Sequence, residues 1–282
     1  MDAEKAPTLA DRSVNDYIPP LLPEPLFMPS PPLYADLSHY YDVLCANIDY
    51  REQYDFMVRA NNIWGTGGKS YLDLACGSGS LLAHFFEGGF SCSGLDLSAD
   101  MLKLARKRCP TATLMCADMK ALSTTQPQDL ISCFLYSTHY CASLSAIEQT
   151  FTKVFESLAP GGLFCFDAVD KDSIANDEGH FHSIRHQEKD LRFQTRWHYS
   201  GQGDVMDLHI SIRELQTQQP LHYQDRHTMT AVKIPTLRQL LEDIGFEVFI
   251  LEHNFGHLNE WQGVNGNVIF CATKPATHKH PA

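Results

Sequence analysis

The chain is 282 residues long and carries a formal net charge of −12, from 22 Lys and Arg side chains against 34 Asp and Glu. This length can bury one substantial core and predicts a single α/β domain with an insertion. So acidic a surface repels the phosphates on which nucleic-acid affinity depends, which disfavours RNA and DNA as substrates and favours a small molecule.

Cysteine usage and hydropathy indicate the cellular setting. The nine cysteines are spread singly, without a C-x-x-C pair, which is typical of buried thiols in a reducing compartment. No stretch has the roughly 18 apolar residues of a membrane span, and the N-terminus lacks the basic and apolar regions of a signal peptide. We therefore expect a cytoplasmic protein without a membrane partner, while the sequence does not indicate an oligomeric state.

The chain begins with a segment of unusual composition. Residues 1–33 contain eight of the fifteen prolines and little apolar periodicity, which predicts a flexible arm. Residues 34–274 read as the main domain, beginning with apolar residues at helical spacing over 34–64. Residues 275–282 read as a loose polar tail.

From residue 71 onward, short apolar runs alternate with amphipathic segments. This order predicts a doubly wound, mostly parallel sheet of seven strands. Caps and glycines mark several helices, with Ser98 before one helix, Ser145 opening a capping box for another, and Gly245 ending a third. A sharp turn over 160–162 is expected to lead into the fifth strand. The expected strands are 71–74, 90–96, 112–116, 129–135, 163–167, 247–252 and 268–273.

Between residues 170 and 233 the apolar period changes from 3.6 to 2. Residues 206–213 alternate apolar and polar side chains without a break, and residues 191–199 and 223–232 are also strand-like. We therefore expect a small three-stranded antiparallel insertion after strand five, placed as a platform or cover over the pocket.

The most informative segment is 71–80 (YLDLACGSGS), in which a strand ending in an acid passes through a glycine loop into a helix. Asp96 ends the next apolar run, 23 positions after Asp73. This spacing is close to that of a ribose-binding carboxylate in a nucleotide-binding βαβ unit.

A series of motifs in this order resembles the class I S-adenosylmethionine (SAM) dependent methyltransferases over residues 40–274. The motifs are 72–79 (LDLACGSG), 94–98 (GLDLS), 117–119 (ADM), 129–131 (DLI), 158–162 (LAPGG) and 241–246 (LEDIGF). The alternative is a nicotinamide dehydrogenase, but its G-x-G-x-x-G fingerprint requires a third glycine where this chain has Leu82. SAM has no phosphate and needs only small residues at the turn.

The resemblance implies SAM as cofactor and S-adenosylhomocysteine (SAH) as product. Asp96 would accept hydrogen bonds from both ribose hydroxyls, although such an acid can also simply cap a helix. Asp118 and the backbone of Met119 would read the adenine amine, with Leu97 and Met119 flanking the ring. For Asp118 a solvated or capping role is the alternative.

The resemblance also implies contacts to the methionine part of SAM. Gly77 and Gly79 would let the backbone approach it, and Asp73 would orient the loop or contact the amino group. Ala75 departs from the glycine that is usual in the family and leaves a methyl group near the cofactor. Two aromatic residues complete the set. Tyr41 would be part of a helix that closes over SAM, or else a half-buried helix aromatic, and Phe134 lies near the end of strand four.

The loop 136–140 (YSTHY) looks like that of N-methyltransferases acting on amino sugars and glycine-like amines. His139 and Tyr140 are the catalytic candidates. His139 could deprotonate an ammonium or a hydroxyl near neutral pH, or it could be a hydrogen-bonded structural histidine. Tyr140 could only cap the pocket.

The insertion supplies the substrate-binding candidates Arg196, Trp197, Arg226 and His227, since a cationic fork with aromatics can grip a carboxylate or phosphate. Cross-strand pairing on a solvated sheet face is the competing interpretation. His180 and His182 have metal-like spacing with His186, but no further ligand is compelling, so no metal is expected.

These observations predict a methyltransferase that acts on a small molecule, with an amine nitrogen ahead of oxygen as acceptor. An O-methyltransferase acting on a hydroxyl or carboxylic acid is the nearest alternative. A SAM-binding protein without transfer activity is the alternative from another class.

Overall fold

The computed structural model describes residues 38–186, 188–215 and 222–276. The predicted arm (1–33) and residues 277–282 of the predicted tail lie outside this part. A seven-stranded sheet has the order β10-β11-β5-β4-β1-β2-β3 and is parallel except for β11, which confirms the predicted fold class. The strands are β1 (Ser70–Leu74), β2 (Ser91–Asp96), β3 (Thr113–Cys116), β4 (Gln128–Cys133), β5 (Leu158–Val169), β10 (Glu247–Glu252) and β11 (Asn267–Thr273).

Helices cover both faces of this sheet, so its central strands are apolar on both sides. Alternate residues of β1 show this, because Leu72 packs in the cluster with α5 (Leu144–Ser157) and α6 (Ile234–Ile244), whereas Tyr71 packs with the opposite helices. Those helices are α2 (Tyr50–Trp64) and α3 (Ser80–Glu87), with α4 (Ala99–Arg108) beside α3. The carboxyl ends of β1, β2, β3, β4 and β5 therefore meet at one edge.

Two local predictions need correction. The N-cap of α5 is Ser143, whose hydroxyl accepts a hydrogen bond from the Ala146 N–H at 3.2 Å, so the cap lies two residues before the predicted one at Ser145. Strand β5 already begins at Leu158, and the expected turn is an irregularity within it at Gly161, where φ is 81°.

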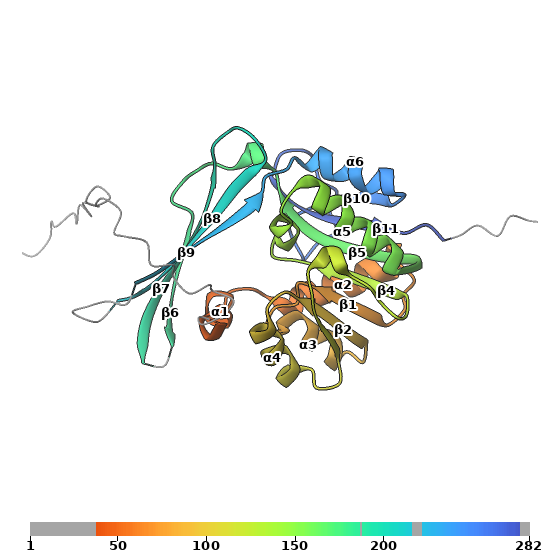
Figure 1. Cartoon of the computed structure of the whole chain (residues 1–282), viewed down its shortest axis with the longest axis horizontal. Helices are drawn as coiled ribbons and strands as arrows, with labels where there is room; N and C mark the ends of the chain where they lie inside the picture. The colour runs from red at the N-terminus through yellow and green to blue at the C-terminus, as the bar shows by residue number, and fades with distance from the viewer. Residues whose placement is uncertain (1–37, 187, 216–221, 277–282) are drawn as a thin grey trace, which may run out of the picture. The chain divides into compact units, whose positions relative to one another are not determined.

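The insertion forms a four-stranded antiparallel sheet in the order β6-β7-β8-β9. Its strands are β6 (His180–His186), β7 (Lys189–Tyr199), β8 (Val205–Glu214) and β9 (His222–Thr230). The prediction of three strands was wrong because β6 is poor in apolar residues and lies at the sheet edge, where alternation is weak. Figure 1 shows the chain leaving β5, building this sheet, and returning from β9 into α6.

One face of the insertion sheet packs against α1 (Ser38–Leu44). Leu191 and Phe193 of β7, with Ile210 of β8, share a buried cluster with Val43 and Leu44 of α1. Since successive side chains of a strand point to opposite faces, the intervening residues lie on the outer, more exposed face. Helix α1 thus joins the insertion to the region beside the glycine loop.

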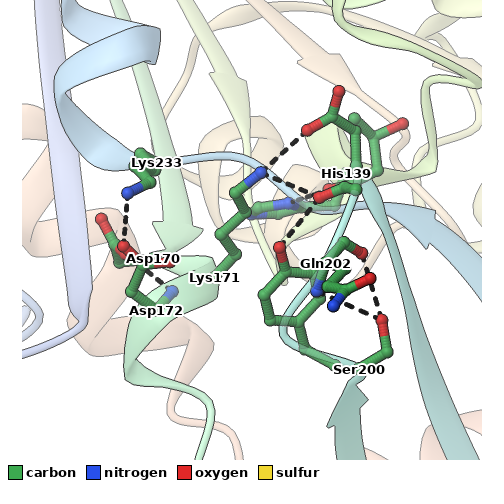
Figure 2. Close-up of polar contacts among 11 residues, drawn as sticks. His139, Asp170, Lys171, Asp172, Ser200, Gln202 and Lys233 are labelled. Carbon is green, nitrogen blue, oxygen red and sulfur yellow. Dashed lines mark hydrogen bonds and ion pairs between the residues drawn. The ribbon is translucent and has the colours of Figure 1, made fainter.

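A polar junction fastens the insertion to the end of β5, as Figure 2 shows. Lys171, in the 3-10 turn η3 (Lys171–Ser173), forms an ion pair with Asp204 at 2.8 Å and donates to the Gly203 carbonyl at 2.9 Å. Lys233 pairs with Asp172 at 2.6 Å. These contacts fix the insertion relative to the carboxyl edge of the main sheet.

Within the described ranges, no helix combines the length and the apolar character required to cross a bilayer. The nine cysteines are free thiols, and eight of them are buried.

Candidate functional site

The glycine loop after β1 adopts a backbone that L-residues rarely take. Gly77 and Gly79 have φ values of 52° and 80°, and a Cβ on Gly79 would lie 2.9 Å from the Ala105 Cβ. Ala75 also has a positive φ, 61°, although it carries a side chain. A left-handed conformation costs an alanine about 1–2 kcal/mol, which explains physically why glycine would suit this position.

A cavity of about 430 Å³ opens at the carboxyl edge of the sheet, within the usual range of small-molecule sites. Its wall combines residues from the loops after β1, β2, β3 and β4 with a residue of α1. Eight of the sequence-predicted residues line it: Tyr41, Ala75, Gly77, Asp96, Leu97, Asp118, Met119 and Tyr140. Gly79 lies outside this lining and is the N-cap of α3.

Asp96 is held rigidly at the end of β2. Its two carboxylate oxygens accept hydrogen bonds from the Gly77 and Ser98 N–H groups, each at 2.8 Å. Burial raises its pKa, although these backbone hydrogen bonds favour the charged form. Each carboxylate oxygen keeps a further lone pair, so the group can accept from a vicinal diol in the cavity.

Asp118 has a local role as well as a place in the cavity wall. Its side chain accepts from the Lys120 N–H at 3.0 Å, capping the 3-10 turn η1 (Met119–Ala121), and it pairs with the Lys120 ammonium at 3.4 Å. The side chain is half-exposed. Asp118 therefore has the capping role that the sequence left open as an alternative. Its carboxylate keeps lone pairs for a ligand.

A smaller cavity, about 30 Å³, adjoins the larger one and shares Tyr41 and Ala75 with it. Phe134 and Asp73 line this smaller cavity, together with Gln53 of α2. Gln53 is only 3% exposed, and its Oε1 has no hydrogen-bond partner among the described residues. The sequence analysis missed Gln53, whose signal is a polar residue on the buried face of an amphipathic helix.

Asp73 is buried beside this cavity at the end of a hydrogen-bonded chain. The Ser132 hydroxyl donates to the Asp73 carboxylate at 2.9 Å and lies 2.6 Å from the Tyr71 hydroxyl. Burial raises the pKa of Asp73 to about 7, with a smaller contribution from the charge of Asp96, against the stabilising hydrogen bond from Ser132. Asp73 can therefore be protonated or charged near neutral pH.

Helix α1 is attached to the glycine loop. Asp42 accepts hydrogen bonds from the Ser78 hydroxyl at 2.5 Å and from the Arg108 guanidinium at 2.6 Å. Arg108 in turn donates to the Ser78 carbonyl. These contacts position the neighbouring Tyr41, whose side chain lines both cavities. The Tyr41 ring lies 3.6 Å from the position that a Cβ on Gly77 would take.

The loop after β4 is strained and held by an acid that the sequence analysis did not assign. Leu135 and Tyr136 both have φ of 58°, and such residues cost of order 1–3 kcal/mol each. The buried Asp167 carboxylate accepts from the Leu135 N–H at 3.1 Å and from the Tyr136 N–H at 2.7 Å. Asp167 thus fixes the loop that carries both catalytic candidates.

The His139 ring is buried, and both of its nitrogens have backbone partners. Nδ1 lies 2.9 Å from the Thr230 carbonyl and Nε2 accepts from the Val169 N–H at 3.1 Å, which assigns the proton to Nδ1. Burial lowers the pKa of His139. The ring has no lone pair for a substrate proton, so the geometry corresponds to the structural alternative and not to the predicted base.

Tyr140 lines the large cavity and contacts the insertion. Its hydroxyl is hydrogen-bonded to Nδ1 of His227, and Nε2 of His227 lies 3.2 Å from the Asp225 carboxylate. The structure thus brings together two sequence-predicted residues, Tyr140 and His227, that are 87 positions apart.

The other substrate-binding candidates are divided between the two faces of the insertion sheet. Trp197 lies on the inner face, 5.4 Å from Tyr136 and 6.5 Å from His139 between ring centroids. Arg196 and Arg226 lie on the outer face, where Arg226 donates to Asp207 at 2.9 and 3.0 Å. The predicted cationic fork over the pocket is therefore wrong for these two arginines, because strand alternation turns them away from it.

The part of the chain that the structure describes contains no group of three or more His, Cys, Asp or Glu side chains that could hold a metal ion. His180, His182 and His186 all lie on β6.

Comparison with known proteins gives the family context of this site. Residues 72–162 match the family model described as a methyltransferase domain. The dTDP-3-amino-3,4,6-trideoxy-α-D-glucopyranose N,N-dimethyltransferase of Streptomyces venezuelae is 36% identical over 94 residues, 33% of this chain and 40% of that enzyme. The chain spans about half the length of the curated relatives that it matches, for example 56% of a Geobacillus relative. A Bacillus subtilis relative is covered over 90% of its length, at 23% identity.

Two solved structures are similar over most of the chain. Streptomyces venezuelae DesVI has a TM-score of 0.73 at 23% identity, with 86% of this chain and 99% of that chain covered. The sugar N-methyltransferase KedS8 from Streptoalloteichus has a TM-score of 0.74 at 18% identity, with 90% and 99% covered. At these identities the likeness establishes the fold.

Proposed function

We propose that this chain is a class I SAM-dependent methyltransferase that transfers a methyl group from SAM to an amine nitrogen of a small molecule. The observation that carries the proposal is the cavity of about 430 Å³ with the anchored Asp96 carboxylate on its wall. The match of residues 72–162 to a methyltransferase domain supports the same conclusion.

The chemistry of the cavity wall fits the parts of SAM. The Asp96 carboxylate would accept hydrogen bonds from the two ribose hydroxyls. Asp118 and the Met119 N–H would hydrogen-bond to the edge of the adenine, and Leu97 and Met119 would flank its ring. In this arrangement the polar groups would meet the hydrogen-bonding groups of the nucleoside, and the apolar side chains would flank its ring. All of these residues line one continuous cavity.

The smaller cavity suits the amino-acid end of the cofactor. An α-ammonium group placed there would donate to Gln53 Oε1 and to the Asp73 carboxylate, and it would supply the partner that the buried Gln53 oxygen lacks among the described residues. A buried carbonyl without a partner costs about 1–3 kcal/mol, so a bound ammonium would remove this penalty.

SAM supplies an electrophilic methyl group on a good leaving group, so the protein contributes mainly proximity and orientation. In this chain Tyr41 and the loop 136–140 would enclose the reacting centre, and the buried His139 would hold that loop against Val169 and Thr230. Of the two catalytic candidates, Tyr140 is the one on the cavity wall.

Three relatives that methylate amino sugars support an amine acceptor. The enzymes from Streptomyces venezuelae and Streptomyces fradiae are N,N-dimethyltransferases of dTDP-linked amino sugars. We infer a small amine of this general kind as substrate. The nine free thiols suit a reducing cytoplasm.

Product analysis tests the proposal. The purified protein would be incubated with SAM labelled with ¹³C in its methyl group and with a panel of amines, alcohols and carboxylic acids, including dTDP-3-amino-3,6-dideoxy-α-D-glucopyranose. An N-methyl carbon signal is the expected result. An O-methyl signal would establish the oxygen alternative, and SAH binding without any transfer would indicate a SAM-binding protein without transfer activity.

A further inference from the structure

The contact between the β4 loop and the insertion is a three-residue polar chain. It runs from the Tyr140 hydroxyl to His227 Nδ1, and from His227 Nε2 to the Asp225 carboxylate at 3.2 Å. The other carboxylate oxygen of Asp225 accepts from the Arg226 N–H at 2.9 Å. The chain therefore begins at the wall of the large cavity and ends at an anchored acid.

The contacts of His227 with Asp225 and Tyr140 indicate its tautomer. A carboxylate only accepts, so Nε2 carries the proton toward Asp225, and the unprotonated Nδ1 accepts from the Tyr140 hydroxyl. His139 has the opposite tautomer, because its Nδ1 donates to the Thr230 carbonyl and its Nε2 accepts from the Val169 N–H. His139 and His227 thus present different nitrogens, and Nδ1 of His227 contacts a hydroxyl on the cavity wall.

The His227 side chain is enclosed by apolar residues and faces the carboxylate of Asp225. The His227 side chain is only 9% exposed, and apolar Leu208, Met229 and Trp197 surround this face of the sheet. Among the residues that the structure describes, the titratable groups in contact with it include Asp225 on β9 and Tyr140 on η2 (Ser137–Tyr140). The charged neighbours Asp207 and Arg226 pair with each other on the outer face.

We propose that Tyr140, His227 and Asp225 form a proton relay that accepts the proton of the substrate amine; this inference rests on the proposed function. The ammonium proton passes to the Tyr140 oxygen as the Tyr140 hydroxyl proton passes to His227 Nδ1, leaving an imidazolium paired with Asp225. The freed nitrogen lone pair then forms the N–CH₃ bond while the S–CH₃ bond breaks and its electron pair stays on sulfur. Tyr140 is the catalytic residue of this relay and stays neutral, while His227 takes up the proton and Asp225 pairs with the imidazolium.

The relay predicts a spectroscopic signature that does not depend on turnover. In ¹⁵N NMR of imidazole-labelled protein, His227 should be in the Nε2–H tautomer and His139 in the Nδ1–H tautomer, each assigned by its His→Gln variant. The Tyr140→Phe substitution should change the Nδ1 signal of His227. His227 in the Nδ1–H tautomer would overturn the proposal.

The kinetic test uses Tyr140→Phe, His227→Gln and Asp225→Asn, with dTDP-3-amino-3,6-dideoxy-α-D-glucopyranose and the amine panel as probes. General-base assistance contributes about 10²-fold or more, so Tyr140→Phe and His227→Gln should lower kcat about a hundredfold at neutral pH and leave the SAH Kd within twofold. The deficit should shrink at a pH where the amine is already unprotonated. The exposed His198, on the outer face of the same sheet, provides the control variant His198→Gln with unchanged kcat.

The outcomes separate the relay from the function on which it rests. Normal kcat in Tyr140→Phe, or an equal loss at every pH, would overturn the relay while methyl transfer stands. No methylation of any amine would overturn the proposed function and the relay with it. Transfer with a pH-dependent loss in the three variants, and no further loss when Tyr140→Phe and Asp225→Asn are combined, would establish both.

Discussion

The Asp167 carboxylate accepts a hydrogen bond from the Tyr136 N–H at 2.7 Å. Through this bond the end of β5 holds the left-handed backbone that follows β4. In Asp167→Asn one acceptor oxygen becomes an amide donor facing an N–H group. We expect a loss of about 1–3 kcal/mol in the free energy of unfolding and at least a tenfold fall in kcat, because small misplacements of reacting groups are costly. Denaturant unfolding and steady-state kinetics measure the two effects.

Asp129 provides the matched control at the opposite end of β4. Its carboxylate accepts from the Ser70 N–H at 3.0 Å and from the hydroxyls of Ser70 and Thr66. Asp129→Asn should therefore lower stability and leave kcat unchanged. Equal loss of kcat in both variants would contradict a specific role of Asp167 in the loop.

The raised pKa of Asp73 predicts how stability depends on pH. Its folded value, about 7, lies above the ordinary 3.8, so the folded state binds its proton more tightly than the unfolded state. The stabilisation is complete below about pH 3.8 and is lost as the pH rises through about 7. The free energy of unfolding of the wild type, minus that of Asp73→Asn, should therefore decrease between pH 4 and pH 8.

The same group predicts how ligand affinity depends on pH. A charged Asp73 attracts an α-ammonium group, so SAH affinity should rise with pH through about 7 in the wild type and stay flat in Asp73→Asn. Calorimetry at pH 6, 7 and 8 makes the measurement. Parallel profiles for both proteins would place the ammonium group elsewhere.

Gln53→Met separates binding from stability. The variant removes a buried oxygen that has no partner among the described residues, so the free energy of unfolding should stay equal or rise. SAH affinity should fall about tenfold, the value of one hydrogen bond to a charged donor. Asn61, also buried on α2 and outside the lining of both cavities, is the control; Asn61→Leu should leave SAH affinity unchanged.

Adjacent residues of β7 test the two faces of the insertion. Trp197 packs against Tyr136 and His139, so Trp197→Leu should lower kcat at least tenfold. Arg196 lies exposed on the other face, and Arg196→Ala should change neither kcat nor KM, with stability within about 0.5 kcal/mol. A rise in KM for Arg196→Ala would restore the predicted contact between this arginine and the substrate.

The parts of the fold and site that the sequence predicted are those with local signals. The glycine loop follows β1, Asp96 ends β2 and Asp118 lies just beyond β3. Parallel strands bring these carboxyl ends to one edge. The strand β6 escaped prediction because His, Ser and Arg at a sheet edge produce little apolar alternation.

The missed features depend on contacts between distant segments. Asp167 contacts a loop 31 positions away, and Tyr140 meets His227 across 87 positions. No local pattern indicates which nitrogens of His139 the packing will occupy. The outward direction of Arg196 and Arg226 could have been predicted, since both precede by one residue a side chain that faces inward.

The most direct test of the central claim is a calorimetric titration with SAH of the wild type and of Asp96→Asn, with NADH as a second ligand. The account predicts micromolar SAH binding to the wild type, a loss of at least tenfold in the variant, and no heat with NADH. Equal SAH affinity in both proteins, or NADH binding in place of SAH, would contradict the assignment of Asp96 and of the cavity that it lines.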